Sequence, residues 1–153
     1  ASLESKGIRV VVDATKDLLL NVLKYHPFLI KPNNHELGEM FGTVCKTDED
    51  IVHYAKKLQE KGAVNVLISM AGDGAILITE DGQNIKMGTP KGKVVNSVGA
   101  GDSMVAGFIT GYIRGGNYEE ALKSGTAAGS ATAFSEGLAS LEMYEKMLKQ
   151  ITE

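Results

Sequence analysis

The chain has little of what marks secreted, membrane-spanning or nucleic-acid-binding proteins. It contains one cysteine, Cys45, so no internal disulfide can form. No apolar run approaches the roughly 20 residues that a membrane-spanning helix needs, and no signal peptide is visible. The 16 Lys and Arg residues against 19 Asp and Glu leave a net charge of −3, without a basic signature over the whole chain. We therefore expect a cytoplasmic protein that binds neither nucleic acid nor membrane.

Several familiar site types are also missing. The segment 88–93 is one residue short of a Walker A loop, has no Ser or Thr after its lysine, and leads into an expected strand. Leu77 and Met104 stand where a dinucleotide-binding fingerprint requires its third glycine. The three histidines have no metal-ligand spacing, and Cys45 has no evident histidine partner. We expect these four side chains to be structural.

What the chain does have is the composition of a folded domain with many glycines. Its 153 residues are 43% hydrophobic and 23% charged, close to the averages for globular proteins. Proline occurs only 3 times, whereas the 18 glycines make up about 12% of the chain, against a usual ~7%. This excess predicts tight turns and close approach of backbone segments.

Strand-like and helix-like segments alternate along the sequence, with helices of 10 to 15 residues. This alternation predicts an α/β fold with a mainly parallel sheet flanked by helices. Thr47 with Asp50 and Asn117 with Glu120 have the spacing of capping boxes at helix starts. We find no repeat, linker or second domain boundary. The expected strands are 8–12, 27–30, 64–68, 75–79, 83–87 and 93–95, and the expected helices are 15–25, 33–41, 47–61, 99–114, 117–134 and 141–151.

A glycine-rich turn opens the expected helix 99–114. Gly99, Ala100 and Gly101 leave backbone N–H groups bare at the start of this helix, where the unpaired donors and the helix dipole favour an anion such as phosphate. Asp102 follows in the first turn and is placed to accept a proton from an attacking hydroxyl. The alternative is that Asp102 only caps the helix and that the glycines only form a turn.

Two further segments follow strands, where an α/β sheet presents its ligand loops. Asn33 and Glu36, which come after Lys31, stand three residues apart on one helix face, a spacing that suits the waters of a magnesium ion but equally a capping box. The segment Ser69–Gly74 follows a buried strand and is either a ligand loop or a plain turn.

A stripe of small residues forms one face of the expected helix 117–134. Such a face lets a flat ring or another helix approach closely, and both uses remain open. Its members are Thr126, Gly129, Ser130 and Ala133.

Taken together, these motifs resemble those of the ribokinase-like, PfkB-type carbohydrate kinases. Asn96–Ile109 fits the family's second signature at all 14 positions, and Asn33 with Glu36 resembles its magnesium motif. Two departures stand out: Ala71 replaces a common glycine, and Asn96 replaces a common aspartate. The resemblance covers essentially the whole chain, and among sugar-phosphate kinases the segment 127–139 is most similar to those that act on fructose 1-phosphate, with tagatose 6-phosphate kinases next.

The resemblance implies a role for each motif. Asp102 would be the general base, and the amides of Gly99, Ala100 and Gly101 would form the anion hole. Asn33 and Glu36 would organise Mg²⁺. The residues implied to contact ATP are Lys31, Ser69, Gly72 and Gly74, with Thr126, Gly129, Ser130 and Ala133 lining the adenine pocket.

The resemblance also implies a division of labour within a longer enzyme. Residues 1–153 would be the nucleotide-binding C-terminal part of the kinase domain, without the N-terminal part that supplies the sugar site and the lid. Alone, such a segment would be inactive. The full-length protein would bind ATP and a phosphorylated sugar and would form a homodimer; a nucleotide-binding module without catalysis remains the alternative.

Overall fold

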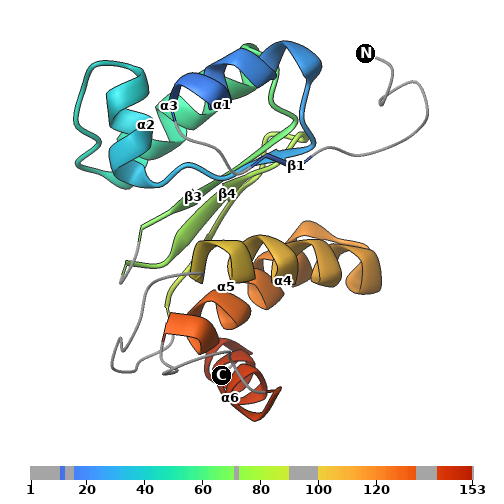
Figure 1. Ribbon diagram of the computed structural model, residues 1–153. Coiled ribbons are helices and arrows are strands. Elements are labelled where there is room, and N and C mark those ends of the chain that lie inside the picture. Colours follow the sequence, from blue (N-terminus) through green and yellow to red (C-terminus); the bar gives the residue numbers. More distant parts are fainter. Residues whose placement is uncertain (1–10, 13–15, 71–72, 90–99, 134–140, 153) are drawn as a thin grey trace. The chain divides into compact units, whose positions relative to one another are not determined.

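The structure, a computed structural model, describes residues 11–12, 16–70, 73–89, 100–133 and 141–152 (Figure 1). The chain divides into two compact units, the first formed by Ala1–Met70 and Ile76–Lys86 and the second by Ala71–Ala75 and Met87–Glu153. The sequence showed no such boundary, because each unit is assembled from two separate stretches and no single linker divides them. In the part of the chain that is described, no helix has the length and apolarity required to span a membrane.

The first unit is built on a five-stranded sheet with the order β1-β2-β3-β4-β5. Parallel pairing joins β1 (Val11–Val12) to β2 (Leu29–Ile30) and β2 to β3 (Asn65–Ser69), with Leu29 opposite Asn65. A hairpin connects β4 (Ala75–Ile78) and β5 (Asn84–Met87), in which the Thr79 N–H donates to the Gln83 carbonyl at 3.0 Å. The predicted α/β fold is confirmed, with a sheet that combines parallel strands and a hairpin.

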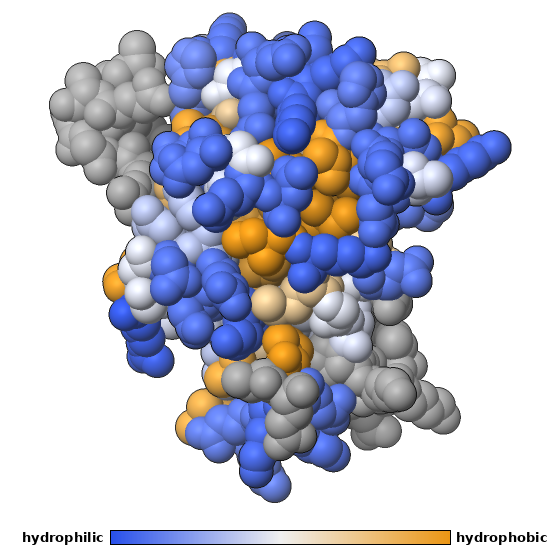
Figure 2. Space-filling model, turned by 180° about the vertical axis from the view of Figure 1, so that it is seen from behind, coloured by the Kyte–Doolittle hydropathy of each residue, from blue (hydrophilic) through white to orange (hydrophobic). Residues whose placement is uncertain are grey.

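Three helices and a short 3-10 turn cover one face of this sheet (Figure 1). They are α1 (Lys16–Val22), η2 (Leu23–Tyr25), α2 (Asn34–Met40) and α3 (Asp48–Glu60). The outer surface of this helical layer, at the top of Figure 2, is mostly hydrophilic. Its inner side chains form a core with those of the strands: Leu19, Leu23, Leu37, Ile51 and Leu58 from the helices, and Ile30, Val66, Ile68 and Ile78 from the sheet.

The helix ends in this unit follow local sequence signals closely. Thr47 and Asp50 form the predicted capping box of α3: the Asp50 N–H donates to Thr47 Oγ1 at 3.1 Å, and the Thr47 N–H donates to Asp50 Oδ2 at 3.2 Å. The Lys46 N–H also donates to Asp50 Oδ2, at 3.0 Å. These backbone donors, Lys46 first, lower the pKa of Asp50 below its ordinary value.

The expected single helix 15–25 is shorter and ends in a tighter turn. α1 stops at Val22, and η2 continues to Tyr25. His26 then takes a left-handed conformation, with φ 52°, and its N–H donates to the Leu23 carbonyl. The tight turn ends the helix before Pro27, as expected for a residue that precedes proline.

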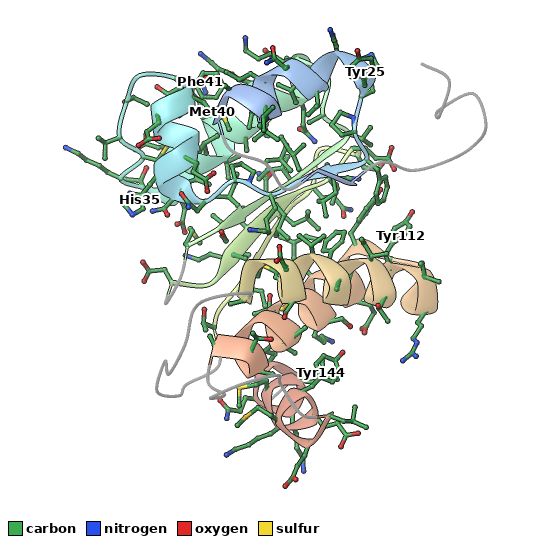
Figure 3. All side chains as sticks on the ribbon, in the orientation of Figure 1. Tyr25, His35, Met40, Phe41, Tyr112 and Tyr144 are labelled. Carbon is green, nitrogen blue, oxygen red and sulfur yellow. The ribbon has the colours of Figure 1, made fainter. Side chains whose placement is uncertain are left out.

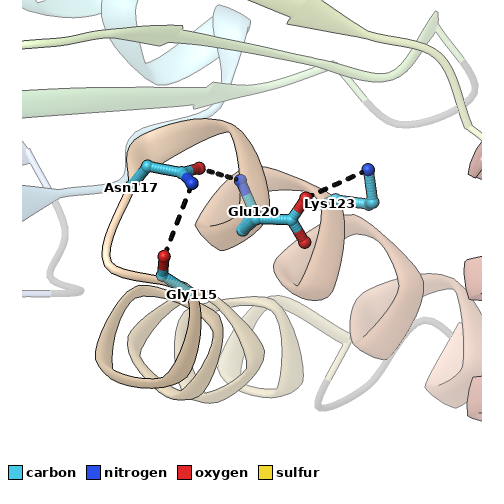
Figure 4. Close-up of polar contacts among 4 residues, drawn as sticks. All are labelled: Gly115, Asn117, Glu120 and Lys123. Atoms are coloured by element: carbon cyan, nitrogen blue, oxygen red, sulfur yellow. Dashed lines mark hydrogen bonds and ion pairs between the residues drawn. The ribbon is translucent and has the colours of Figure 1, made fainter.

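The second unit contains α4 (Ala100–Gly115), α5 (Tyr118–Ala133) and α6 (Leu141–Thr152). Met147 of α6 is buried against Ala127 and Ala131 of α5, and Tyr144 packs beside this cluster (Figure 3). At the start of α5, Asn117 Oδ1 accepts the Glu120 N–H at 2.8 Å, as predicted for a helix cap (Figure 4). The Glu120 carboxylate pairs instead with Lys123 Nζ, at 3.3 Å.

Several expectations lie wholly or partly outside the described residues. They are the first part of strand 8–12, the cap Thr15, the strand 93–95, the turn at Gly99 and the end of helix 117–134.

Gly62 allows two backbone segments of the first unit to meet at the end of α3. It has φ +135°, and its carbonyl lies 3.0 Å from His26 Nδ1. A Cβ at this position would lie only 2.0 Å from the Leu23 carbonyl oxygen. Contact at that distance requires the backbone of one segment to move.

We predict that Gly62→Ala destabilises the chain by at least ~3 kcal/mol, because it combines a positive φ with a backbone clash. Gly82→Ala is the matched control: Gly82 also has a positive φ, +82°, but no atom of the described residues lies within 4 Å of a Cβ there. It should cost only about 1 kcal/mol. Urea unfolding of both variants measures the difference, and equal losses would show that the close approach at Gly62 contributes nothing.

Candidate active site

The carboxyl ends of β2 and β3 bring three of the predicted ATP and magnesium residues together. Asn33 and Ser69 face each other in a parallel β-bridge just beyond the paired strands. The Ser69 N–H donates to the Pro32 carbonyl at 3.2 Å, which extends the pairing by one step. Lys31 precedes this bridge and is half-buried. The first unit therefore places Lys31, Asn33 and Ser69 at the carboxyl ends of its parallel strands, where α/β proteins bind ligands.

Asn33 and Glu36 form the capping box that was the structural alternative to a metal site. Asn33 Oδ1 accepts the Glu36 N–H at 2.8 Å, and the Asn33 N–H donates to Glu36 Oε1 at 3.3 Å. Both residues are half-buried. The box uses one oxygen of each side chain, so Glu36 Oε2 and Asn33 Nδ2 take no part in it. Capping is thus established, and it leaves a carboxylate oxygen for a second role.

The residues near Asn33 and Glu36 fit a magnesium ion that keeps most of its bound waters. Among the described residues, no group of three or more His, Cys, Asp or Glu side chains is arranged to hold a metal ion. Mg²⁺ keeps several waters and is commonly held by one or two carboxylates together with substrate phosphates. A single half-buried carboxylate such as Glu36 fits that mode of binding and does not fit a cage made of protein ligands alone.

The loop after β3 contains one glycine that the backbone requires. Gly74 is buried with φ +95°, and a Cβ there would lie 2.1 Å from the Met87 carbonyl oxygen. Gly74 therefore has a structural reason to be glycine, whether or not it also contacts a nucleotide. Gly72, the other predicted glycine, lies outside the described residues.

The first turn of α4 carries the predicted catalytic group of the second unit. α4 begins at Ala100, so Gly101 and Asp102 belong to its first turn. Asp102 is exposed, and Ala100 and Gly101 are half-buried. The first N–H groups of a helix have no acceptor within it, which makes this turn a place where an anion is stabilised. Gly99 lies outside the described residues.

One of the small residues predicted to form a stripe on α5 packs against α4. Gly129 lies against α4, because a Cβ there would be 3.2 Å from the Ala100 carbonyl oxygen and from Met104 Cβ. Close helix packing, one of the two uses left open, is therefore realised at Gly129. Thr126 and Ser130 are buried, and Ala133 is half-buried. Within the described residues, no hydrogen bond partner reaches Thr126 Oγ1. Their expected contact with adenine stays a prediction.

Sequence reasoning left close packing of α5 open but did not identify α4 as the partner helix. A Cβ at Gly107 would lie 2.6 Å from the Ser124 carbonyl oxygen, and one at Gly125 would lie 2.8 Å from the Met104 carbonyl oxygen. A second connection is a hydrogen bond from Thr132 Oγ1 to Ser103 Oγ, 2.7 Å long. The glycine spacing on the two helices was the available signal, whereas nothing in the sequence pairs residues 103 and 132.

Cys45 and the histidines do not form a further reactive centre with one another in the described residues. Partial burial, followed by the nearby Asp50 charge, raises the pKa of the Cys45 thiol, which disfavours the reactive thiolate. His35 is exposed on α2 (Figure 3), and the His26 ring contacts the Gly62 carbonyl. These observations agree with structural roles.

Comparison with known proteins identifies the family. The chain is 49% identical over 148 residues to a 1-phosphofructokinase from Bacillus subtilis, covering 97% of this chain and 48% of that protein. It is 40% identical over 145 residues to a D-tagatose-1-phosphate kinase from Bacillus licheniformis, covering 94% of this chain and 47% of that protein. The chain thus spans about half the length of these relatives.

A solved structure supports the same assignment at the level of the fold. The structure of Arabidopsis thaliana ribokinase complexed with ribose and ATP matches with a TM-score of 0.80 at 25% identity, covering 97% of this chain and 50% of that one. The ribokinase-like fold expected from the sequence is confirmed. The family model described as pfkB family carbohydrate kinase matches residues 2–143. The chain belongs to the pfkB family of carbohydrate kinases.

Proposed function

We propose that the protein carrying this chain is an ATP-dependent sugar-phosphate kinase that converts fructose 1-phosphate to fructose 1,6-bisphosphate. The names of the two relatives support a ketose 1-phosphate as the acceptor. The observation that carries the proposal is the first turn of α4, where an exposed carboxylate, Asp102, follows the bare amides of a helix start. A proton acceptor beside an anion site is what transfer of a phosphoryl group to a hydroxyl requires.

The reaction assigns separate tasks to these groups. The sugar hydroxyl gives its proton to the Asp102 carboxylate, its oxygen bonds to the γ-phosphorus of ATP, and the bond to the bridging oxygen breaks, releasing ADP. The amides of Gly99, Ala100 and Gly101 stabilise the negative charge on the transferring group. A loose transition state asks little of the base until late, so Asp102 need not be strongly basic.

Nucleotide and metal binding complete the proposal. Lys31, Ser69, Gly72 and Gly74 contact ATP, and Thr126, Gly129, Ser130 and Ala133 line the adenine pocket. The Thr126 hydroxyl, which has no partner in the described part of the chain, supports this assignment. Asn33 and Glu36 hold the waters of Mg²⁺. The bound ion supplies charge neutralisation at the phosphates.

We also propose that these residues are the C-terminal, nucleotide-binding part of the kinase, and that the full protein forms a homodimer. A tagatose 6-phosphate kinase and a nucleotide-binding module without catalysis remain the alternatives. Steady-state assays of the full protein with fructose 1-phosphate, tagatose 1-phosphate, tagatose 6-phosphate and fructose 6-phosphate separate the acceptors, and absence of turnover with all four would favour the module.

We predict that Asp102→Asn lowers kcat of the full protein by at least about 10²-fold, the lower range for loss of a general base, with little change in KM for ATP. Asp102 is the third residue of α4, where asparagine loses only the small stabilisation that a charged carboxylate gives a helix start, so a purely structural role predicts almost no change in kcat. Glu119→Gln is the matched control, because Glu119 is an exposed acid in the first turn of α5. A kcat of Asp102→Asn within a few-fold of the wild type would reduce Asp102 to a cap.

Glu36→Gln tests the metal role separately from capping. Glutamine serves equally in a capping box, so thermal stability should stay nearly unchanged. Loss of the carboxylate charge should raise the magnesium concentration that gives half-maximal rate. Asp50→Asn, at the matching position of the α3 box, should leave this concentration unaltered. Identical magnesium dependence in wild type and Glu36→Gln would return the pair to capping alone.

The 153-residue chain by itself should lack a sugar site. Its motifs handle the nucleotide, the metal and the proton, and no cluster of Arg and Lys in the sequence is evident for clamping an anionic sugar. Positioning supplies much of the catalysis in phosphoryl transfer, so the chain alone should bind Mg-ATP weakly and phosphorylate nothing. Calorimetric titration with Mg-ATP, beside a coupled assay with fructose 1-phosphate, measures both. Robust sugar phosphorylation would reveal a sugar site within these residues.

A further inference from the structure

A hydrogen bond between two hydroxyl groups joins the first turn of α4 to the last turn of α5. Thr132 Oγ1 donates to Ser103 Oγ at 2.7 Å, across 29 residues of sequence. Ser103 directly follows Asp102, and Thr132 is the penultimate residue of α5. Both side chains are half-buried, so the bond lies at the margin of the helix contact.

Gly129 of α5 makes a second contact with the first turn of α4, at Ala100. Gly129 lies one turn before Thr132 on α5, and a Cβ on it would be 3.2 Å from the Ala100 carbonyl oxygen. The first turn of α4 is therefore fastened at Ala100 by close packing and at Ser103 by a hydrogen bond. Asp102 lies between these two points.

The first turn of a helix needs such support when it carries a reacting group. Helix ends fray, because their terminal N–H groups lack partners within the helix. Stabilisation of a transferring phosphoryl group depends on donors that are already in place, and small misplacement of a reacting group is costly.

We propose that Ser103 and Thr132 are a positioning pair that holds the first turn of α4, and with it Asp102, in the geometry for phosphoryl transfer. This inference rests on the proposed function, since it assigns the pair to the same reaction. Neither residue touches substrate in this proposal; both act through the placement of the turn.

The test uses variants of the full protein that remove one hydroxyl each. Ser103→Ala and Thr132→Val should each lower kcat about 10-fold while KM for ATP changes less than 2-fold. The double variant should lose no more than either single one, because both remove the same bond. Thr132→Ser keeps the hydroxyl and should restore most of the rate.

A matched control removes a hydroxyl from the same helix without breaking a bond between helices. Thr110 Oγ1 of α4 donates to the Ala106 carbonyl at 2.9 Å within its own helix. Thr110→Val should therefore keep kcat within 2-fold of the wild type. Equal losses in Thr110→Val and Thr132→Val would overturn the proposal, as would a kcat in Thr132→Val within 2-fold of the wild type.

Hydrogen exchange separates this proposal from the proposed function. The N–H groups of Met104 and Val105 close the first turn by bonding to the carbonyls four residues earlier. Their exchange should accelerate at least 5-fold in Thr132→Val but not in Thr110→Val. If the wild type transfers phosphate to no sugar phosphate, the proposed function fails and the catalytic role of the pair fails with it. Hydrogen exchange then still decides whether the pair holds the turn: unchanged exchange overturns that, and faster exchange supports it.

Discussion

The structure of the second unit depends on the close packing of α4 and α5, whose contact is lined by glycines. Gly107 and Gly111 on α4 and Gly125 and Gly129 on α5 all lie at this contact, and a Cβ at any of them would meet the opposite helix at 2.6 to 3.2 Å. Backbone atoms therefore pack directly on one another over several turns. Such a tightly packed contact leaves the two helices little freedom to slide along each other. The whole length of the contact therefore fixes the position of the first turn of α4 relative to α5.

Elements governed by local chemistry were predictable from the sequence. The α3 start at Thr47 and Asp50 was found because a capping box involves residues three apart. The expected strands 75–79 and 83–87 correspond to β4 and β5, and Gly82 between them has the positive φ that favours glycine. The end of α1 was placed three residues too late, since periodicity alone does not distinguish an α-helix from a closing 3-10 turn. The two-unit division escaped prediction because each unit joins distant stretches.

In the candidate site too, features set by local sequence were predictable and features set by packing were not. Asn33 and Glu36 were identified by spacing, but spacing is identical for a cap and for a metal site, and the structure shows that the cap leaves one carboxylate oxygen over. The stripe on α5 was identified by spacing, but spacing does not specify what packs on it, and the structure shows Gly129 against α4. The Ser103–Thr132 bond could not be foreseen, because it links two helices through residues with no shared pattern.

The capping box at Asn33 has a further consequence for how a metal would be received. A free glutamate samples many rotamers, and fixing such a side chain costs up to about 1.5–2 kcal/mol of conformational entropy. The bond from the Asn33 N–H to Glu36 Oε1 restricts that sampling as the chain folds. Part of the entropy is then lost during folding rather than during binding, so a cation at Glu36 Oε2 would meet a carboxylate that is already oriented.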